Sequence, residues 1–157
     1  MDIQIMTTLL ERRRIEAQFA KAIYDEILPE LGEEKSLALL GNVARKLALE
    51  MGQELADTKD GETSLHSFAD IQSIWRAGGA LEIEEHEQRD DYLAFDVVRC
   101  RYAEMYHEIG ANKLGAALSC NRDGTLCEGY DKRIKMQRTK TIMEGFDHCD
   151  FRYTFGK

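Results

Sequence analysis

The sequence lacks any apolar run long enough to cross a membrane. Its longest apolar-rich windows, such as residues 74–81, which Arg76 interrupts, fall far short of the roughly 20 residues that a transmembrane helix needs. The first residues, from Met1 to Arg14, show no basic region followed by an apolar stretch and a small-residue cleavage site. We therefore expect no membrane span and no secretory leader, and a cytoplasmic protein.

Positive charge is also scarce. Lysine and arginine total 21 against 29 for aspartate and glutamate, which gives a net charge of −8 at pH 7. Nucleic-acid binders gain affinity when their cations displace counterions from phosphates, and a net negative charge opposes that gain. No nucleic-acid partner is therefore expected. The four cysteines are expected to be free thiols, because a reducing compartment disfavours a disulfide framework.

No internal repeat, low-complexity tract or linker divides the chain. With 157 residues, of which 43% are hydrophobic and 32% charged, it has the size and composition of one domain with one core. We expect a single domain over residues 1–157.

Helical spacing of apolar residues dominates the N-terminal half. The expected helices cover residues 3–31, 33–57 and 63–79. The first contains Arg12–Arg14, interpreted as an exposed turn, and ends near Pro29 and Gly32. The third ends at Gly78–Gly79, and its Trp75 either contributes to a homodimer interface or packs in the core of one chain.

Alternating patterns follow. One strand starts at Ala80 and a second follows Asp90 and Asp91, which together predict a hairpin. Residues 102–118 return to helical spacing, with a break at Gly110, and strands are expected again at 133–142 and 148–155. The fold class is therefore α+β: N-terminal helices packed on a four-stranded antiparallel sheet, with a helical insertion between the strand pairs.

Two short segments, 119–127 and 148–152, each combine a thiol, a carboxylate and a guanidinium. Cys120 follows a helical run, so we expect it in a loop beside Asn121, Arg122 and Asp123, where cationic and hydrogen-bonding neighbours favour the thiolate. A plain turn at Asp123 and Gly124 is the competing interpretation.

Strand alternation assigns the remaining polar groups to faces. Arg99 falls on the apolar face of its strand and so does Arg138, and each then needs an anion, either a protein carboxylate or that of a substrate. Cys149 faces one side of the last strand, as a nucleophile or a small core residue. Asp150 and Arg152 face the other, as site residues or as a simple ion pair.

Zinc is a minor alternative. Cys120, Cys127, His148 and Cys149 are suitable ligand types, but six residues separate the first two and the last two are adjacent, unlike the spacing of structural zinc sites. No cofactor is expected.

Several ordered motifs resemble one family. They are Arg99–Ala103, Leu118–Asp123, Gly145 and His148–Arg152. Together they are similar to the L-2-amino-thiazoline-4-carboxylic acid hydrolase family over about residues 81–153. The layout, with its Cys-x-Phe last strand, is also distantly similar in fold to the small-ligand-binding 4-vinyl reductase domains.

The family resemblance implies a hydrolase that opens a small carboxylate-bearing cyclic amidine by attack of a thiolate or activated water on a C–N bond, giving an N-carbamoyl-cysteine type of product. The implied catalytic residues are Cys120, which is the favoured nucleophile, Asp123, Cys149 and His148. The implied substrate-binding residues are Arg152, Arg138, Arg99, Asn121 and Asp150. The alternative is a non-catalytic ligand-binding or sensor domain that uses the same pocket.

Overall fold

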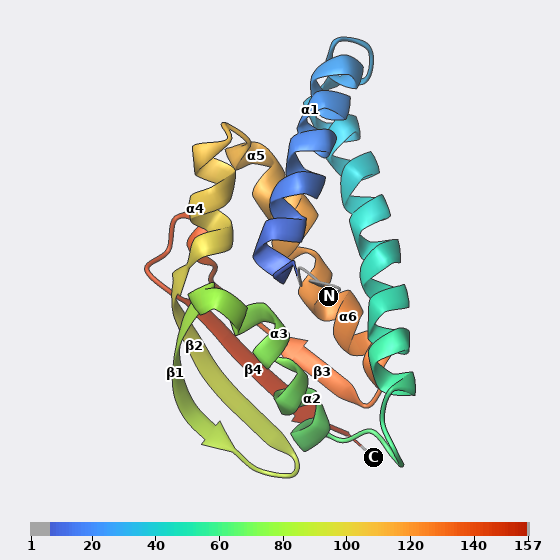
Figure 1. Cartoon of the computed structure of the whole chain (residues 1–157), viewed down its shortest axis with the longest axis vertical. Helices are drawn as coiled ribbons and strands as arrows, with labels where there is room; N and C mark the ends of the chain where they lie inside the picture. The colour runs from blue at the N-terminus through green and yellow to red at the C-terminus, as the bar shows by residue number, and fades with distance from the viewer. Residues whose placement is uncertain (1–6, 157) are drawn as a thin grey trace, which may run out of the picture.

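The computed structural model describes residues 7–156 (Figure 1). Its helical elements are α1 (Leu9–Asp57), α2 (Leu65–Ile71), α3 (Ser73–Arg76), η1 (Ala77–Gly79), α4 (Arg101–Glu108), α5 (Asn112–Gly115), the π-helical turn η2 (Ala116–Cys120), α6 (Arg122–Tyr130) and η3 (Ile142–Glu144). The strands are β1 (Leu81–Gln88), β2 (Tyr92–Cys100), β3 (Ile134–Gln137) and β4 (Cys149–Phe155). The predicted α+β class is confirmed.

The long element α1 is a helical hairpin rather than one rod (Figure 1). Thr8 caps its start, and Gly32 reverses the chain with φ 77° and ψ 168°, a backbone conformation that strongly favours glycine. The two arms confirm the first two predicted helices. The first begins at Leu9, and predicted helical residues 3–6 lie outside the described part of the chain.

The second arm of α1 packs closely against α6, and small residues make that approach possible. A Cβ placed on Gly52 would overlap the carbonyl oxygen of Leu126, and one placed on Gly129 would overlap that of Leu49. The two backbones therefore meet directly, which holds α6 between the hairpin and the sheet.

The sheet is antiparallel with strand order β1-β2-β4-β3. Its inner face contributes Leu93, Phe95, Val97, Cys149 and Tyr153 to a core that also contains residues of α1, α2 and α6. The last predicted strand pair is confirmed, but β3 ends at Gln137 rather than at residue 142, because Asp150 accepts the backbone N–H groups of Thr139 and Lys140.

The predicted loop after residue 118 is wrong. From Asn112 to Tyr130 the chain stays helical, through α5, η2 and α6. The backbone N–H of Asn121 donates to the carbonyl of Ala116 at 2.9 Å, an i→i+5 bond that opens the helix by one residue without ending it. Asp123 and Gly124 consequently lie in the first turn of α6, not in a turn between elements.

The third predicted helix is divided at Gln72 into α2 and α3. Trp75 is half-buried and packs on the core, which is the second of the two alternatives considered for it. No helix within residues 7–156 has both the length and the hydrophobicity required to span a bilayer.

Candidate active site

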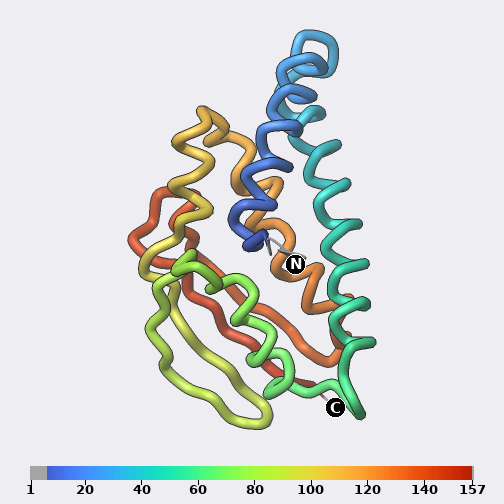
Figure 2. Tube along the Cα trace, in the orientation of Figure 1, coloured from blue at the N-terminus to red at the C-terminus, as the bar shows by residue number. Residues whose placement is uncertain are grey.

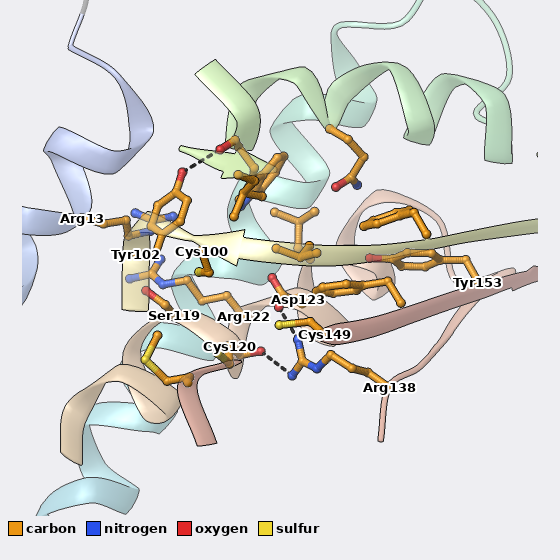
Figure 3. Close-up of a pocket in the computed structure, with 18 of the residues that line it drawn as sticks. Arg13, Cys100, Tyr102, Ser119, Cys120, Arg122, Asp123, Arg138, Cys149 and Tyr153 are labelled. Carbon is orange, nitrogen blue, oxygen red and sulfur yellow. Dashed lines mark hydrogen bonds and ion pairs between the residues drawn. The ribbon is translucent and has the colours of Figure 1, made fainter. Parts of the chain in front are cut away.

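A cavity of about 80 Å³ lies between the inner face of the sheet and helices α2, α3 and α6 (Figure 3). One water molecule needs roughly 10–15 Å³ of such space, so the cavity has room for a compact ring-sized molecule. Segments far apart in the sequence line it, from Arg13 in α1 to Tyr153 in β4. The start of α1 reaches it because this end of the hairpin lies beside η2 and α6 (Figure 2).

Aromatic rings form one side of the cavity. Phe95 stacks on Phe151 with ring centroids 5.1 Å apart, and Tyr153 meets the edge of Phe68 at 5.1 Å. Strand alternation brings these rings to one face, since Phe95, Phe151 and Tyr153 are all inward positions of β2 and β4. This apolar wall is suited to contact with a small ring-shaped molecule.

Arg138 connects two of the predicted site residues. Its Nη1 donates to the Asp123 carboxylate, and its Nη2 donates to the backbone carbonyl of Cys120 at 3.1 Å. The guanidinium also lies over the ring of Phe151, 5.1 Å from the centroid. Arg138 thus points inward as predicted. Its anion is the carboxylate of Asp123, which is the first of the two alternatives considered for it, a protein carboxylate or that of a substrate.

The charge on Asp123 is set by opposing influences. Burial raises the pKa of Asp123, whereas the neighbouring Arg138 guanidinium lowers it, and the net direction is upward. A carboxylate with a raised pKa accepts a proton more readily than an ordinary aspartate does. Asp123 is therefore a suitable proton acceptor inside the cavity.

The cavity thiols do not have the expected thiolate character. Burial, and then the charge of Asp123, raises the pKa of Cys120, and Arg138 offsets only part of this. Burial also raises the pKa of Cys149, whose Sγ accepts the backbone N–H of Ile142 at 3.2 Å, and that of Cys100 to about 11. The raised pKa of each thiol favours the protonated form over the thiolate at neutral pH.

The π-helical turn determines which side chains of η2 face the cavity. Ser119 and Cys120 both line it, and the Ser119 hydroxyl is bonded to the Tyr106 hydroxyl at 2.9 Å. Asn121, predicted to bind substrate, instead donates through Nδ2 to the backbone carbonyl of Gly41 at 3.1 Å. Its amide fastens η2 to α1 and does not line the cavity.

Arg13 and Arg122, which the sequence analysis did not propose as site residues, lie at the end of the cavity away from Tyr153 (Figure 3). Arg13 is only 6% exposed, so the interpretation of Arg12–Arg14 as an exposed turn is wrong at its central residue. Arg122 comes from the first turn of α6. The four-residue steps Leu9, Arg13 and Ala17, all buried, are the sequence signal that places Arg13 on the inner face.

Arg99 does not face the cavity, contrary to the prediction. Ile83 pairs with Val97 and Glu82 with Arg99, so Val98 is an extra residue in β2. This bulge reverses the alternation after Val97 and brings Cys100 inward. Arg99 is left at the surface, where it pairs with Glu82 and Glu104.

Three more predicted site residues do not line the cavity. Arg152 donates to the Asp96 carboxylate at 2.9 Å and to the carbonyl of Phe95 at 3.0 Å, on the outer face of the sheet. Asp150 accepts bonds from the chain after β3 instead of pairing with Arg152. His148 pairs with its exposed neighbour Asp147 at 2.6 Å.

The residues considered as zinc ligands are separated. Cys120 and Cys149 line the cavity, whereas Cys127 is buried in the core and His148 lies elsewhere. Among the described residues 7–156, no three or more histidine, cysteine, aspartate or glutamate side chains are grouped as metal ligands.

Comparison with known proteins gives one family and one fold. The model of the family described as L-2-amino-thiazoline-4-carboxylic acid hydrolase matches residues 12–153. No curated protein matches the chain. A solved structure, the phenol-responsive sensory domain of the transcription activator PoxR with phenol, is similar with a TM-score of 0.56 and 8% identity, covering 88% of this chain and 74% of that one. At this identity the likeness concerns the fold alone.

Proposed function

The chain belongs to the L-2-amino-thiazoline-4-carboxylic acid hydrolase family, and on that basis we propose that it hydrolyses a small cyclic amidine that carries a carboxylate. The observation that supports this most directly is the meeting of Cys120, Asp123 and Arg138 inside one aromatic-walled cavity. A nucleophile, a proton acceptor and a cation are the groups that such a reaction needs.

The proposed reaction adds water to the amidine carbon of a ring such as 2-aminothiazoline-4-carboxylate. The carbon–nitrogen double bond is attacked, and the ring carbon–sulfur bond then breaks. The water oxygen becomes a carbonyl oxygen, one of its protons goes to the ring nitrogen and the other to the departing sulfur. The product is an N-carbamoyl-cysteine type of thiol.

Cys120 is the proposed nucleophile, in a covalent version of this reaction. Its thiol transfers a proton to Asp123 as the sulfur adds to the amidine carbon, which compensates for the raised pKa of the buried thiol. Asp123 then passes that proton to the departing ring sulfur, which leaves an isothiourea on Cys120. Water adds to the isothiourea carbon, its oxygen becomes the ureido carbonyl oxygen, and its two protons go to the substrate nitrogen and to the Cys120 sulfur, which departs as the thiol. Arg138 holds Asp123 and the Cys120 backbone in place, and Cys149 is the reserve nucleophile.

The test is to incubate the purified protein with 2-aminothiazoline-4-carboxylate and to follow ring loss and thiol product by mass spectrometry. Cys120→Ala should abolish turnover and change the melting temperature by only a few degrees. Cys127→Ala is the matched control, because Cys127 is a buried thiol that does not line the cavity, and it should retain turnover. Full turnover in Cys120→Ala would show that Cys120 is not the nucleophile.

A second candidate function is ligand binding without turnover. The raised pKa of each of the three cavity thiols favours it, since a thiol is a weak nucleophile until a base removes its proton. The similar fold also serves as a phenol-responsive sensory domain in PoxR. Saturable binding of the amidine acid with no ring loss over many hours would support this candidate against the first.

A further inference from the structure

Arg13 and Arg122 lie together at the end of the cavity away from the Tyr153 ring (Figure 3). Their side chains are 7% and 11% exposed, so both guanidiniums are largely removed from water. One comes from the first arm of α1 and the other from α6, which means that tertiary packing alone brings the two cations together.

The two cations share one carboxylate. Glu16 is bonded to Arg13 Nη1 at 2.8 Å and to Arg122 Nη2 at 3.2 Å, and its own side chain is 39% exposed. One negative charge that faces partly into water therefore serves two buried positive charges. A buried cation without full compensation is costly, so this end of the cavity favours an anion.

Arg138, unlike Arg13 and Arg122, has a carboxylate of its own, that of Asp123. Burial alone would lower the pKa of Arg138, but the charge of Asp123 outweighs it and the net direction is upward, as expected of a cation with its own anion. For Arg122, burial and then repulsion from Arg13 lower the pKa, and Glu16 does not reverse this. The surplus positive charge thus lies at the Arg13 and Arg122 end.

We propose that Arg13 and Arg122 bind the carboxylate of the ligand and make the cavity selective for small planar acids over uncharged rings. The inference rests on the proposed function in one respect, the orientation of the ligand. The carboxylate lies at Arg13 and Arg122, and the amidine carbon, at the opposite end of the ligand, lies toward Cys120 and Asp123. Arg138, which is already paired, then serves the reacting end and does not anchor the carboxylate.

The neighbouring groups fit this orientation. Ser119 lines the cavity and its hydroxyl, bonded to that of Tyr106, offers one further polar contact to a carboxylate. The Tyr102 hydroxyl donates to the backbone carbonyl of Trp75 at 3.1 Å, so it is already engaged. The ring of the ligand then contacts the apolar lining of the cavity, to which Phe95 and Phe151 contribute.

Calorimetric binding to the full-length protein tests the proposal with two matched probe pairs. The first pair is 2-aminothiazoline-4-carboxylate and its 4-carboxamide, and the second is benzoate and phenol. Arg13→Gln and Arg122→Gln should each weaken binding of the acid of either pair by about 10- to 100-fold, the effect of losing a charge-assisted hydrogen bond. They should change binding of the uncharged partner less than about threefold.

Further variants keep the result interpretable if a glutamine variant folds poorly. Glu16→Gln removes the competing carboxylate and should strengthen acid binding severalfold, the opposite direction. Arg13→Lys retains the charge without the planar fork and should recover part of the lost affinity. Arg14→Gln, next to Arg13 but paired with Glu108 at the surface, should leave the affinity for the acids unchanged.

Each result decides the proposal. The proposal is overturned if Arg13→Gln and Arg122→Gln bind the acids as tightly as wild type does. It is also overturned if Arg138→Gln is the only variant that loses the preference for the acid over its uncharged partner, or if the wild-type protein prefers neither acid over its uncharged partner. Absence of turnover together with Arg13-dependent preference for benzoate over phenol would overturn only the proposed hydrolase function and leave this inference standing.

Discussion

At the scale of single residues, Asp123 and Asp150 show how surroundings decide what a carboxylate does. Asp123 lines the cavity, and burial raises its pKa in spite of Arg138. Asp150 lies in the inner strand β4, beyond the end of β3, where burial raises its pKa but bonds from Thr139 and Lys140 outweigh this and lower the pKa to about 2. The first faces the cavity with a raised pKa, and the second holds the connection after β3 in shape.

Asp150→Asn should destabilise the fold in a way that depends on pH. The folded pKa lies below the ordinary value of 3.8, so the stabilisation by Asp150 is complete above about pH 4 and disappears as the pH falls toward 2. We expect a loss of about 1 kcal/mol at pH 7, the value of a typical hydrogen bond. Urea unfolding at pH 7 and pH 3 measures it.

The difference in stability between wild type and Asp150→Asn should shrink at pH 3. Asp60→Asn serves as the control, because Asp60 is an exposed carboxylate in the turn between α1 and α2. A difference that stays constant between the two pH values would contradict the assignment of the lowered pKa to Asp150.

At the scale of elements, helix α6 depends on glycine at one position and not at another. A Cβ on Gly129 would overlap the backbone of Leu49 in α1, whereas a Cβ on Gly124 would make an ordinary contact with Met136 at 3.7 Å. Both glycines lie within the same helix, so their intrinsic effect on helix stability is similar. Their neighbours alone distinguish them.

Gly129→Ala should therefore destabilise the protein by about 2 kcal/mol or more through overpacking. Gly124→Ala should stabilise it by up to about 1 kcal/mol, because alanine is the better helix former. Chemical denaturation of the two variants beside wild type measures both effects. Equal changes in the two variants would mean that α1 and α6 do not pack at this distance.

A single extra residue in β2 shows how an element changes a site. Without the bulge at Val98, regular alternation would place Arg99 on the same face as Val97, as the sequence analysis assumed. The bulge moves Cys100 to the inner face and Arg99 to the surface. The bulge thus replaces a predicted cation of the cavity by a thiol.

At the scale of the whole molecule, the cavity couples distant parts of the chain. Its lining includes Arg13 from the first arm of α1, Trp75 from α3, Cys120 from η2 and Tyr153 from the last strand. A ligand that contacts these elements together binds only the folded state, so binding must raise the stability of the whole fold.

An acid that fits the cavity should raise the melting temperature. At a concentration of 100 times Kd the stabilisation is about 2.7 kcal/mol, which corresponds to roughly 5–10 °C for a chain of this size. Differential scanning fluorimetry with 2-aminothiazoline-4-carboxylate measures the shift. Because its affinity is expected to be 10- to 100-fold weaker, Arg13→Gln should remove about half of the shift or more at the same ligand concentration. A shift of equal size in that variant would contradict the proposed site.

Local sequence patterns determined the α+β class, the two arms of α1, the four strands and the inward direction of Cys149 and Arg138, because helix and strand periods depend on neighbouring residues. Only the tertiary structure decided that Arg13 and Arg122 share a cavity and that Arg99 is outside it. A bulge, a π-helical turn and the direct approach of α6 to α1 made those choices. All three depend on contacts between residues far apart in the sequence, which no local period records.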